Sequence, residues 1–178
     1  MNFMSFSKEA GISVAEVKRL LFIFRNMFII TLIETYLSNK KLEIIKNPKL
    51  YFLDNGLRNI VLNNFLQQRA DLGVLYESFV LQELLKQGFN ANFWCTKGKS
   101  EVDFVLQING QVIPSEVKMR DASITRSYRS SLEKYRPSIG FLFNLNERTK
   151  LKTESAHFEK RFLAEIIHFK DILESESA

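Results

Sequence analysis

Residues 101–118 read EVDFVLQINGQVIPSEVK, and they carry the clearest structural signal in the chain. Alternating apolar positions lie on both sides of Asn109-Gly110, which is the strongest short signal for a two-residue β-hairpin turn. If this turn sets the register, Ile108 pairs with Gln111, and every further cross-strand pair follows from that one. The sequence therefore predicts a long antiparallel hairpin.

In this register Asp103 falls opposite Glu116, and Glu101 falls opposite Lys118. Side chains two positions apart on a strand share a face, so all four charged groups lie on one face, and the other face is mostly apolar and suits a core. Two carboxylates directly opposite one another repel at a cost of about 0.2–1 kcal/mol. A cation turns that cost into a gain, because hard divalent metals bind carboxylate oxygens. The hairpin thus predicts a metal site beside a lysine.

The composition fits one ordinary domain, or a small domain and a larger one. The chain has 178 residues, of which 46% are hydrophobic, and a formal net charge of +5, which permits an anionic partner such as nucleic acid. The lone Cys95 excludes an internal disulfide framework and fits a reducing compartment. The longest apolar run, 20–33, is too short and too polar to cross a bilayer, and no cleavable signal precedes it. We expect a cytoplasmic protein without membrane contact.

Residues 1–47 predict a reduced winged helix. Ser13 and Glu16 form a capping box that opens a helix, along which apolar residues recur at helical spacing. A strand rich in Ile and Thr follows at 28–36, and after a polar turn a second strand returns at 42–46. Helix, turn, helix and β-ribbon is the order of a partial winged helix-turn-helix. Little chain precedes it, so we expect the trimmed end of a longer protein.

Asn47-Pro48 marks a domain boundary, since proline ends regular structure, and residues 48–178 predict a second, mixed α/β domain. The predicted helices lie at 57–66, 71–87 and 127–136, the predicted strands at 50–53, 93–96, 139–144 and 162–169 beside the hairpin, and a polar loop at 146–159.

Basic residues at two places are candidate contacts to a nucleic-acid backbone. Lys18 and Arg19 lie on the second helix of the N-terminal segment, for which burial against a neighbouring domain is an open alternative. Arg126 and Arg129 lie at and near the start of the basic helix that follows the hairpin, for which a solvated face is an equal alternative.

Glu77 is a further candidate for the metal site. It lies in the predicted helix 71–87 and is closely flanked by apolar residues, so its carboxylate is expected to point into the protein rather than simply to water. A helix packed on the sheet would bring it beside Asp103. The alternative is a glutamate at the edge of the core, a role that Glu83 would fill equally well.

These residues predict phosphodiester hydrolysis. That reaction needs charge neutralisation on the phosphate and a nucleophilic water, both of which Mg²⁺ held by carboxylates supplies. Glu77, Asp103 and Glu116 are the expected metal ligands, with Glu101 as an accessory one. Lys118 is expected to orient the water or to steady the phosphate, so that Asp103, Glu116 and Lys118 form the catalytic group. A solvated hairpin face, with Glu101 and Lys118 as a weak surface pair, is the alternative.

The same residues resemble a known superfamily. Glu77 on a helix, Asp103, and Glu116-Val-Lys118 resemble the PD-(D/E)XK nuclease pattern, with Val102 in place of its proline. Four blocks together resemble domain of unknown function 4143, and they are KLYFLDNGL (49–57), GVLYESFV (73–80), FWCTKGKSEVDF (93–104) and EVK (116–118).

The resemblance implies a restriction-endonuclease-like fold, with a mixed sheet flanked by helices. It also implies that a winged helix and an AAA-type P-loop ATPase module precede this domain in the native protein. Gly98-Lys99-Ser100 ends like a P-loop, but Phe93 stands where the first glycine is required, so ATP is not expected to bind there.

Three hypotheses for the function follow. The first is a Mg²⁺-dependent nuclease-like domain that acts on DNA. The second is a non-catalytic module that binds nucleic acid or a partner and regulates a separate ATPase. The third is an inactive nuclease fold used only for assembly.

Overall fold

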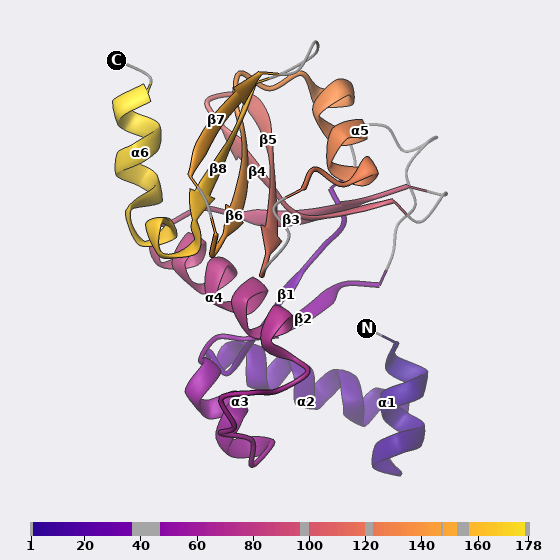
Figure 1. Cartoon of the computed structure of the whole chain (residues 1–178). Coiled ribbons are helices and arrows are strands. Elements are labelled where there is room, and N and C mark those ends of the chain that lie inside the picture. Colours follow the sequence, from indigo (N-terminus) through magenta and orange to yellow (C-terminus); the bar gives the residue numbers. More distant parts are fainter. Residues whose placement is uncertain are drawn as a thin grey trace.

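The computed structural model describes residues 2–36, 47–96, 100–119, 123–146, 148–152 and 157–176. Within these ranges a six-stranded sheet has the order β3-β4-β5-β6-β8-β7, and a separate two-stranded ribbon is formed by β1 and β2 (Figure 1). The strands are β1 (Ile30–Ile33), β2 (Lys49–Phe52), β3 (Ala91–Cys95), β4 (Glu101–Ile108), β5 (Gln111–Lys118), β6 (Gly140–Asn144), β7 (Thr149–Lys152) and β8 (His157–Phe162). The helices are α1 (Phe3–Ala10), α2 (Val14–Asn26), α3 (Asn55–Val61), α4 (Leu72–Lys86), α5 (Arg126–Tyr135), the 3-10 helix η1 (Leu163–His168) and α6 (Phe169–Glu176).

The predicted hairpin is confirmed as β4 and β5. Ile108 pairs with Gln111, and the same register continues to Phe104 opposite Ser115. The backbone φ angles are 51° at Asn109 and 77° at Gly110, as a two-residue turn with both central residues in the left-handed region requires. Beyond the hairpin the sheet becomes mixed, because β5, β6 and β8 run parallel.

A β-bulge interrupts β4 where the acidic residues lie. On the side of β3, Asn92 pairs with Val105 but Trp94 pairs with Val102. Two steps along β3 therefore correspond to three steps along β4, and the extra residue falls at Asp103-Phe104, opposite Phe93. A bulge bends its strand and re-aims a side chain, which the simple alternation of the sequence does not predict.

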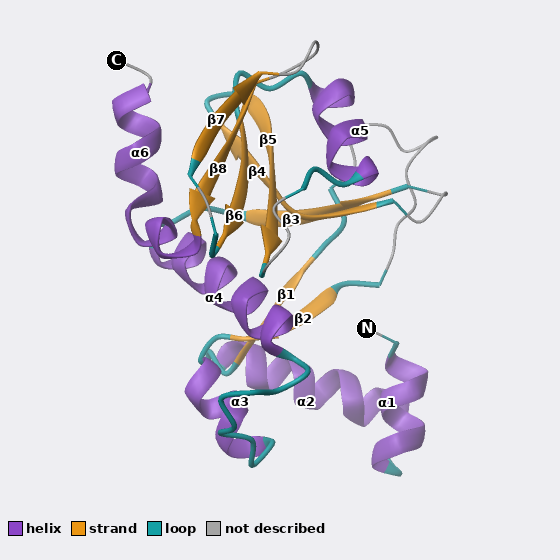
Figure 2. Ribbon diagram, viewed as in Figure 1, coloured by secondary structure: helices purple, strands orange, loops and turns teal. Residues whose placement is uncertain are grey.

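Helices cover both faces of the sheet (Figure 2). Successive side chains of a strand point to opposite faces, and the neighbours Val112 and Ile113 accordingly belong to different apolar clusters. Ile113 lies in the cluster to which α4 contributes Leu84. Val112 packs against the cluster to which α5 contributes Leu132. The mixed α/β class predicted from the sequence is thus confirmed.

The N-terminal helices follow the sequence prediction, and the ribbon differs from it. The capping box is present, since Glu16 N donates to Ser13 Oγ at 3.2 Å and Ser13 N donates to Glu16 Oε2 at 2.9 Å. The strand expected at 42–46 lies outside the described residues. The strand that pairs antiparallel with β1 is β2, which lies beyond the boundary predicted at Asn47-Pro48.

The C-terminal prediction is wrong in two places. Strands β7 and β8 occupy much of the range predicted as a loop, 146–159. Their charged residues hide the pattern, because Glu159 and Arg161 form an ion pair with only 4% of each residue exposed. Because both residues are charged, the sequence of this strand resembles that of an exposed polar loop.

The range predicted as a strand, 162–169, is mostly the 3-10 helix η1. Leu163, Ile166 and Phe169 are the buried residues, at 5%, 0% and 0% exposure. Their spacing of three matches the three residues per turn of a 3-10 helix. A run of six residues is too short for this period to stand out against strand alternation.

Gly140, at the start of β6, provides a test of the packing between α5 and the sheet. A Cβ there would lie 2.7 Å from both Leu132 Cδ2 and Tyr128 Oη, and both side chains are buried. We expect Gly140→Ala to lower the free energy of unfolding by about 1–3 kcal/mol, because an overpacked core must shift. Gly73→Ala in α4 is the control, since a Cβ there meets nothing within 4 Å, and it should be neutral or stabilising. Urea denaturation measures both, and equal midpoints for the two variants would contradict this packing.

Candidate functional site

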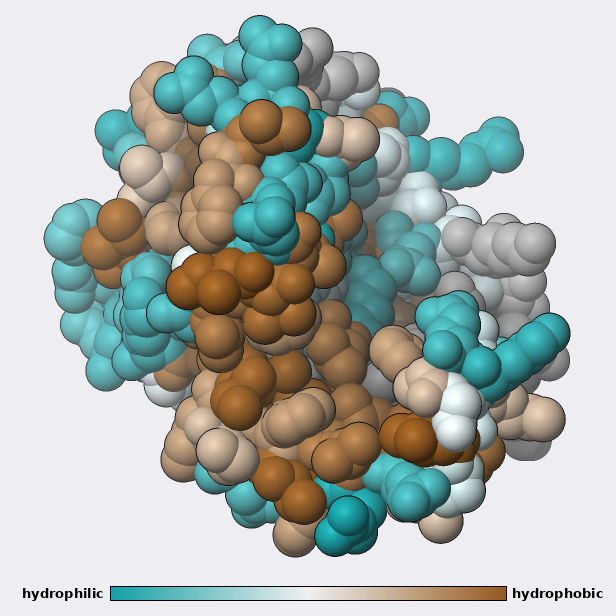
Figure 3. Space-filling view, turned by 90° about the horizontal axis from the view of Figure 1, so that it is seen from below, coloured by the Kyte–Doolittle hydropathy of each residue, from teal (hydrophilic) through white to brown (hydrophobic). Residues whose placement is uncertain are grey.

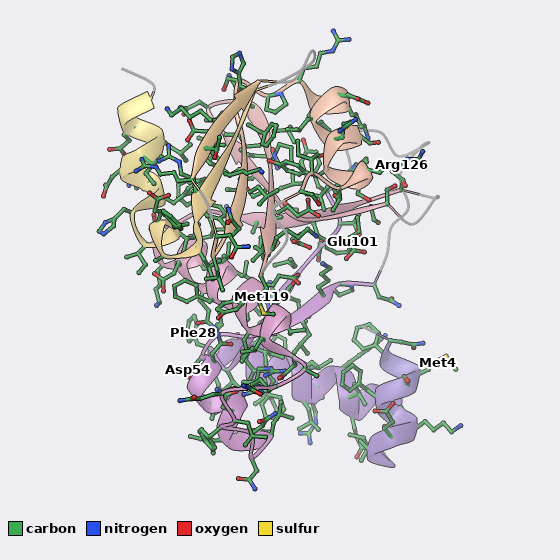
Figure 4. The ribbon with its side chains drawn as sticks, viewed as in Figure 1. Met4, Phe28, Asp54, Glu101, Met119 and Arg126 are labelled. Carbon is green, nitrogen blue, oxygen red and sulfur yellow. The ribbon has the colours of Figure 1, made fainter. Side chains whose placement is uncertain are left out.

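Charged residues from three parts of the fold meet where β4 and β5 reach the open end of the hairpin. Figure 4 labels Glu101, which begins β4. The group comprises Glu101 and Asp103 of β4, Glu116 and Lys118 of β5, Glu77 of α4, and Lys49 and Tyr51 of β2. We call it the carboxylate–lysine cluster.

Asp103 lies at the bulge. Its Oδ2 accepts a hydrogen bond from Val117 N at 2.9 Å. Burial, together with the negative charges of Glu77 and Glu116, raises the pKa of Asp103 to about 7, although the hydrogen bond and the charge of Lys49 oppose the rise. The acids are therefore close enough to disfavour one another's charge.

Glu77 points into this cluster, as predicted for a carboxylate on the apolar side of its helix. Its Oε1 lies 3.2 Å from Lys49 Nζ and accepts a hydrogen bond from the Tyr51 hydroxyl. Burial and the Glu77 charge raise the pKa of Tyr51, which stays a neutral donor. Glu83, the alternative candidate, instead pairs with Lys86 one turn further along α4, at 2.5 Å.

Glu116 and Lys118 form the second half of the cluster. Glu116 is 3% exposed, and its Oε1 lies 2.9 Å from Lys118 Nζ. Thr125 Oγ1 donates to the Glu116 carboxylate at 3.1 Å and also accepts from Tyr128 N at the start of α5. Burial opposes the charge of Lys118, but the hydrogen bond and charge of Glu116 outweigh burial and raise the pKa of that lysine.

The hairpin register predicted that Asp103 pairs with Glu116 and that Glu101 pairs with Lys118. The described pairs between β4 and β5 end at Phe104 with Ser115 and include neither of them. Asp103 reaches the backbone of β5 rather than facing Glu116 in the ladder. Glu101 pairs with Lys49 at 2.7 Å. The charged groups are thus gathered at one end of the sheet, with different partners from those that the register alone predicts.

Lys49 and Tyr51 were missed in the sequence, although a signal was present. Both lie in the block 49–57, Tyr51 within the strand expected at 50–53 and Lys49 directly before it. In the structure β2 begins at Lys49, so the two residues are two apart in one strand and share a face. A lysine and a tyrosine on one face of an otherwise apolar strand can both donate to a carboxylate, so they indicate a buried acid nearby.

The donor chemistry of the cluster fits a hard divalent ion, because its ligands would all be carboxylate oxygens. Within the described ranges, no group of three or more His, Cys, Asp and Glu side chains is arranged to hold a metal ion. The carboxylates are instead paired with Lys49 and Lys118.

The four predicted nucleic-acid contacts lie in two places. Arg126 and Arg129 are exposed on α5, directly after the Thr125 that binds Glu116. Lys18 and Arg19 are exposed on α2, and Lys18 Nζ lies 5.5 Å from the centre of the Phe3 ring. Only the pair on α5 adjoins the cluster through its own helix.

Fold and cluster together define a mixed α/β domain with paired carboxylates and lysines at the end of its sheet. The chain belongs to the family Domain of unknown function (DUF4143), whose profile matches residues 72–163, more than half of the 178 residues. A second profile, Domain of unknown function (DUF8612), matches residues 1–68. No curated protein gives a match. No helix in the described part of the chain combines the length and the apolar character needed to span a bilayer.

The two matches divide the cluster. Glu77, Asp103 and Glu116 lie within the DUF4143 match, whereas Lys49 and Tyr51 lie within the N-terminal match. The block 49–57, taken from the sequence as part of the DUF4143 pattern, thus falls outside that match. The cluster is built from both regions.

Asp103 provides a test by pH. Its raised pKa means that the ionised form is disfavoured in the folded protein, so the cost is absent below the ordinary value of 3.8 and complete above about 7. Relative to Asp103→Asn, we expect the free energy of unfolding of the wild type to fall between pH 4 and pH 7 by about 2–4 kcal/mol. The asparagine oxygen can still accept from Val117 N.

Urea denaturation at a series of pH values measures this difference. Asp171→Asn is the control, because the Asp171 side chain is 78% exposed, and its curve should run parallel to that of the wild type. If the curve of Asp103→Asn also ran parallel to that of the wild type, the pKa of Asp103 would not be raised in the folded protein.

Proposed function

We propose that this chain is a Mg²⁺-dependent nuclease-like domain that hydrolyses phosphodiester bonds in DNA. The convergence of Glu77, Asp103 and Glu116 beside Lys118 supports it, because groups from α4, β4 and β5 meet although they are far apart in the sequence. Metal-assisted hydrolysis of a phosphodiester uses carboxylates that converge in this way, because they hold the ion that activates the water.

Each residue has a role in this proposal. Glu77, Asp103 and Glu116 would hold the metal, which would supply charge neutralisation for the phosphate and activation of a water. Lys118 would donate a hydrogen bond to the water or to a phosphate oxygen. The Val117 N–H holds Asp103, and Thr125 holds Glu116, so both carboxylates are oriented before the substrate arrives.

The surroundings of the cluster favour a nucleic-acid substrate. Arg126 and Arg129 project from α5 next to the Glu116 half of the cluster and are exposed. Guanidinium groups bind phosphate oxygens well, and contacts of this kind hold a backbone without reading its sequence. The net charge of +5 acts in the same direction.

A second candidate is a non-catalytic module that binds a partner and regulates a P-loop ATPase. An apolar groove of about 450 Å³ between α1, α2, α3 and the β1–β2 ribbon favours it. Figure 3 shows apolar side chains gathered on this underside of the molecule. Val61 and Phe24, which line the groove, are 62% and 38% exposed, and contiguous apolar patches mark interaction surfaces.

Plasmid nicking tests the first candidate. With Mg²⁺ or Mn²⁺ present, we expect Asp103→Ala, Glu116→Ala and Glu77→Gln each to reduce cleavage by about 100-fold or more, since each removes an expected metal ligand. Glu83→Gln is the matched control on α4 and should cleave like the wild type. Cleavage that survives both Asp103→Ala and Glu116→Ala would reject this assignment.

The second candidate predicts the opposite pattern. Plasmid DNA stays intact, divalent metals leave the melting temperature unchanged, and the rate of ATP hydrolysis by a P-loop ATPase added in trans changes. Val61→Asp should abolish that change, because a charge cannot be buried in the groove without cost. Ile167→Asp, which replaces a residue 49% exposed on η1, should not. An inactive fold used for assembly predicts neither cleavage nor a metal-dependent melting temperature.

A further inference from the structure

Lys49 connects two acids that come from different elements. Its Nζ lies 3.2 Å from Glu77 Oε1 on α4 and 2.7 Å from Glu101 Oε1 on β4, and 5.3 Å from the centre of the Phe93 ring. The Lys49 side chain is 23% exposed. The ammonium group therefore has two carboxylates and one aromatic face around it.

Strand pairing holds the backbone of Lys49 in place. Lys49 pairs with Ile33 in the β1–β2 ribbon. Beyond β1 the chain continues against the edge strand of the large sheet, where Phe93 N donates to Glu34 O at 3.0 Å and Tyr36 N donates to Phe93 O at 2.6 Å. The ribbon is thus joined to the sheet beside the cluster, and Lys49 needs little reordering to reach it.

Lys49 also stabilises the acids that would bind a metal. Its ammonium group lies within ion-pair distance of the carboxylates of Glu77 and Glu101. Glu116 is paired instead with Lys118, whose Nζ lies 2.9 Å from Glu116 Oε1. Lys49 is therefore the counter-ion of the Glu77 and Glu101 side of the cluster.

A divalent ion would compete with this ammonium group. Both need the oxygens of Glu77, and two cations a few ångströms apart in a partly buried space repel strongly. Lys49 belongs to the N-terminal match, and the two acids with which it pairs, Glu77 and Glu101, belong to the DUF4143 match. The competition thus places metal loading under the control of the N-terminal segment.

We propose that Lys49 is a tethered counter-ion that holds the carboxylate–lysine cluster together without metal and that must leave Glu77 when a divalent ion binds. This inference rests on the proposed function, since it takes the cluster as the metal site. It adds a regulatory coupling: whatever moves the β1–β2 ribbon away from the cluster strengthens metal binding there, and metal binding loosens the ribbon by the same factor.

Calorimetric titration of the whole chain with Mn²⁺ tests the coupling. We expect Lys49→Met to bind Mn²⁺ at least about tenfold more tightly than the wild type, because the competing charge is gone. Without metal it should melt at a lower temperature than the wild type, and saturating Mn²⁺ should close that gap. Lys86→Met, which removes a lysine of α4 that pairs with Glu83 at 2.5 Å, is the control and should bind like the wild type.

Wild-type protein supplies a second measurement, which does not depend on the folding of a variant. Acetylation of lysines by an amine-reactive ester, followed by mass spectrometry, reports the exposure of each ammonium group. We expect saturating Mn²⁺ to increase the labelling of Lys49 several-fold and to leave that of Lys86 unchanged.

The outcomes separate the two proposals. Equal Mn²⁺ affinity of wild type and Lys49→Met, or unchanged labelling of Lys49 at saturating metal, overturns the counter-ion role and leaves the metal site standing. No Mn²⁺ binding by the wild type or by Lys49→Met overturns the metal site, and the counter-ion role with it. Tighter binding together with increased labelling supports both.

Discussion

Repulsion among carboxylates that share a partly buried space is the constraint on which the rest of this structure depends. Burial and the charge of Glu77 raise the pKa of Asp103 to about 7, so the fold must supply positive charge close by or give up stability. Lys49 and Lys118 supply it. Strands β2 and β5 carry these two lysines to the end of the sheet where α4 and β5 place Glu77 and Glu116.

This constraint also connects the two halves of the chain. The N-terminal residues contribute a lysine and a tyrosine through β2, and the residues of the DUF4143 match contribute the acids. Removing one partner of a partly buried ion pair destabilises the fold, because the charge of the other partner is then left uncompensated. The ribbon is therefore coupled to α4 through Glu77 and to the sheet through Glu101, beyond the backbone hydrogen bonds to Phe93.

Much of the fold was predictable where the signal was local. Asn109-Gly110 set the register of β4 and β5, and the capping box of Ser13 and Glu16 placed the start of α2. The last strands were not predictable, because the buried pair Glu159 and Arg161 gives β8 the composition of a loop. The sequence alone does not show that these two charged residues are buried against each other.

The candidate site was predictable in its acids and not in its counter-ion. Alternation along the hairpin and the apolar neighbours of Glu77 pointed to one acidic cluster. The bulge at Asp103-Phe104 arises from the pairing of β4 with β3, a contact that the hairpin sequence does not encode. Lys49 lies 28 residues before Glu77, and only the tertiary fold brings the two together.

Anomalous diffraction from crystals of this chain soaked in Mn²⁺ tests the central claim most directly. We expect one strong peak in contact with carboxylate oxygens of Glu77, Asp103 and Glu116, with the Lys49 ammonium group moved away from Glu77. Carboxylates still paired with Lys49 and Lys118, with no peak between them at saturating Mn²⁺, would contradict it.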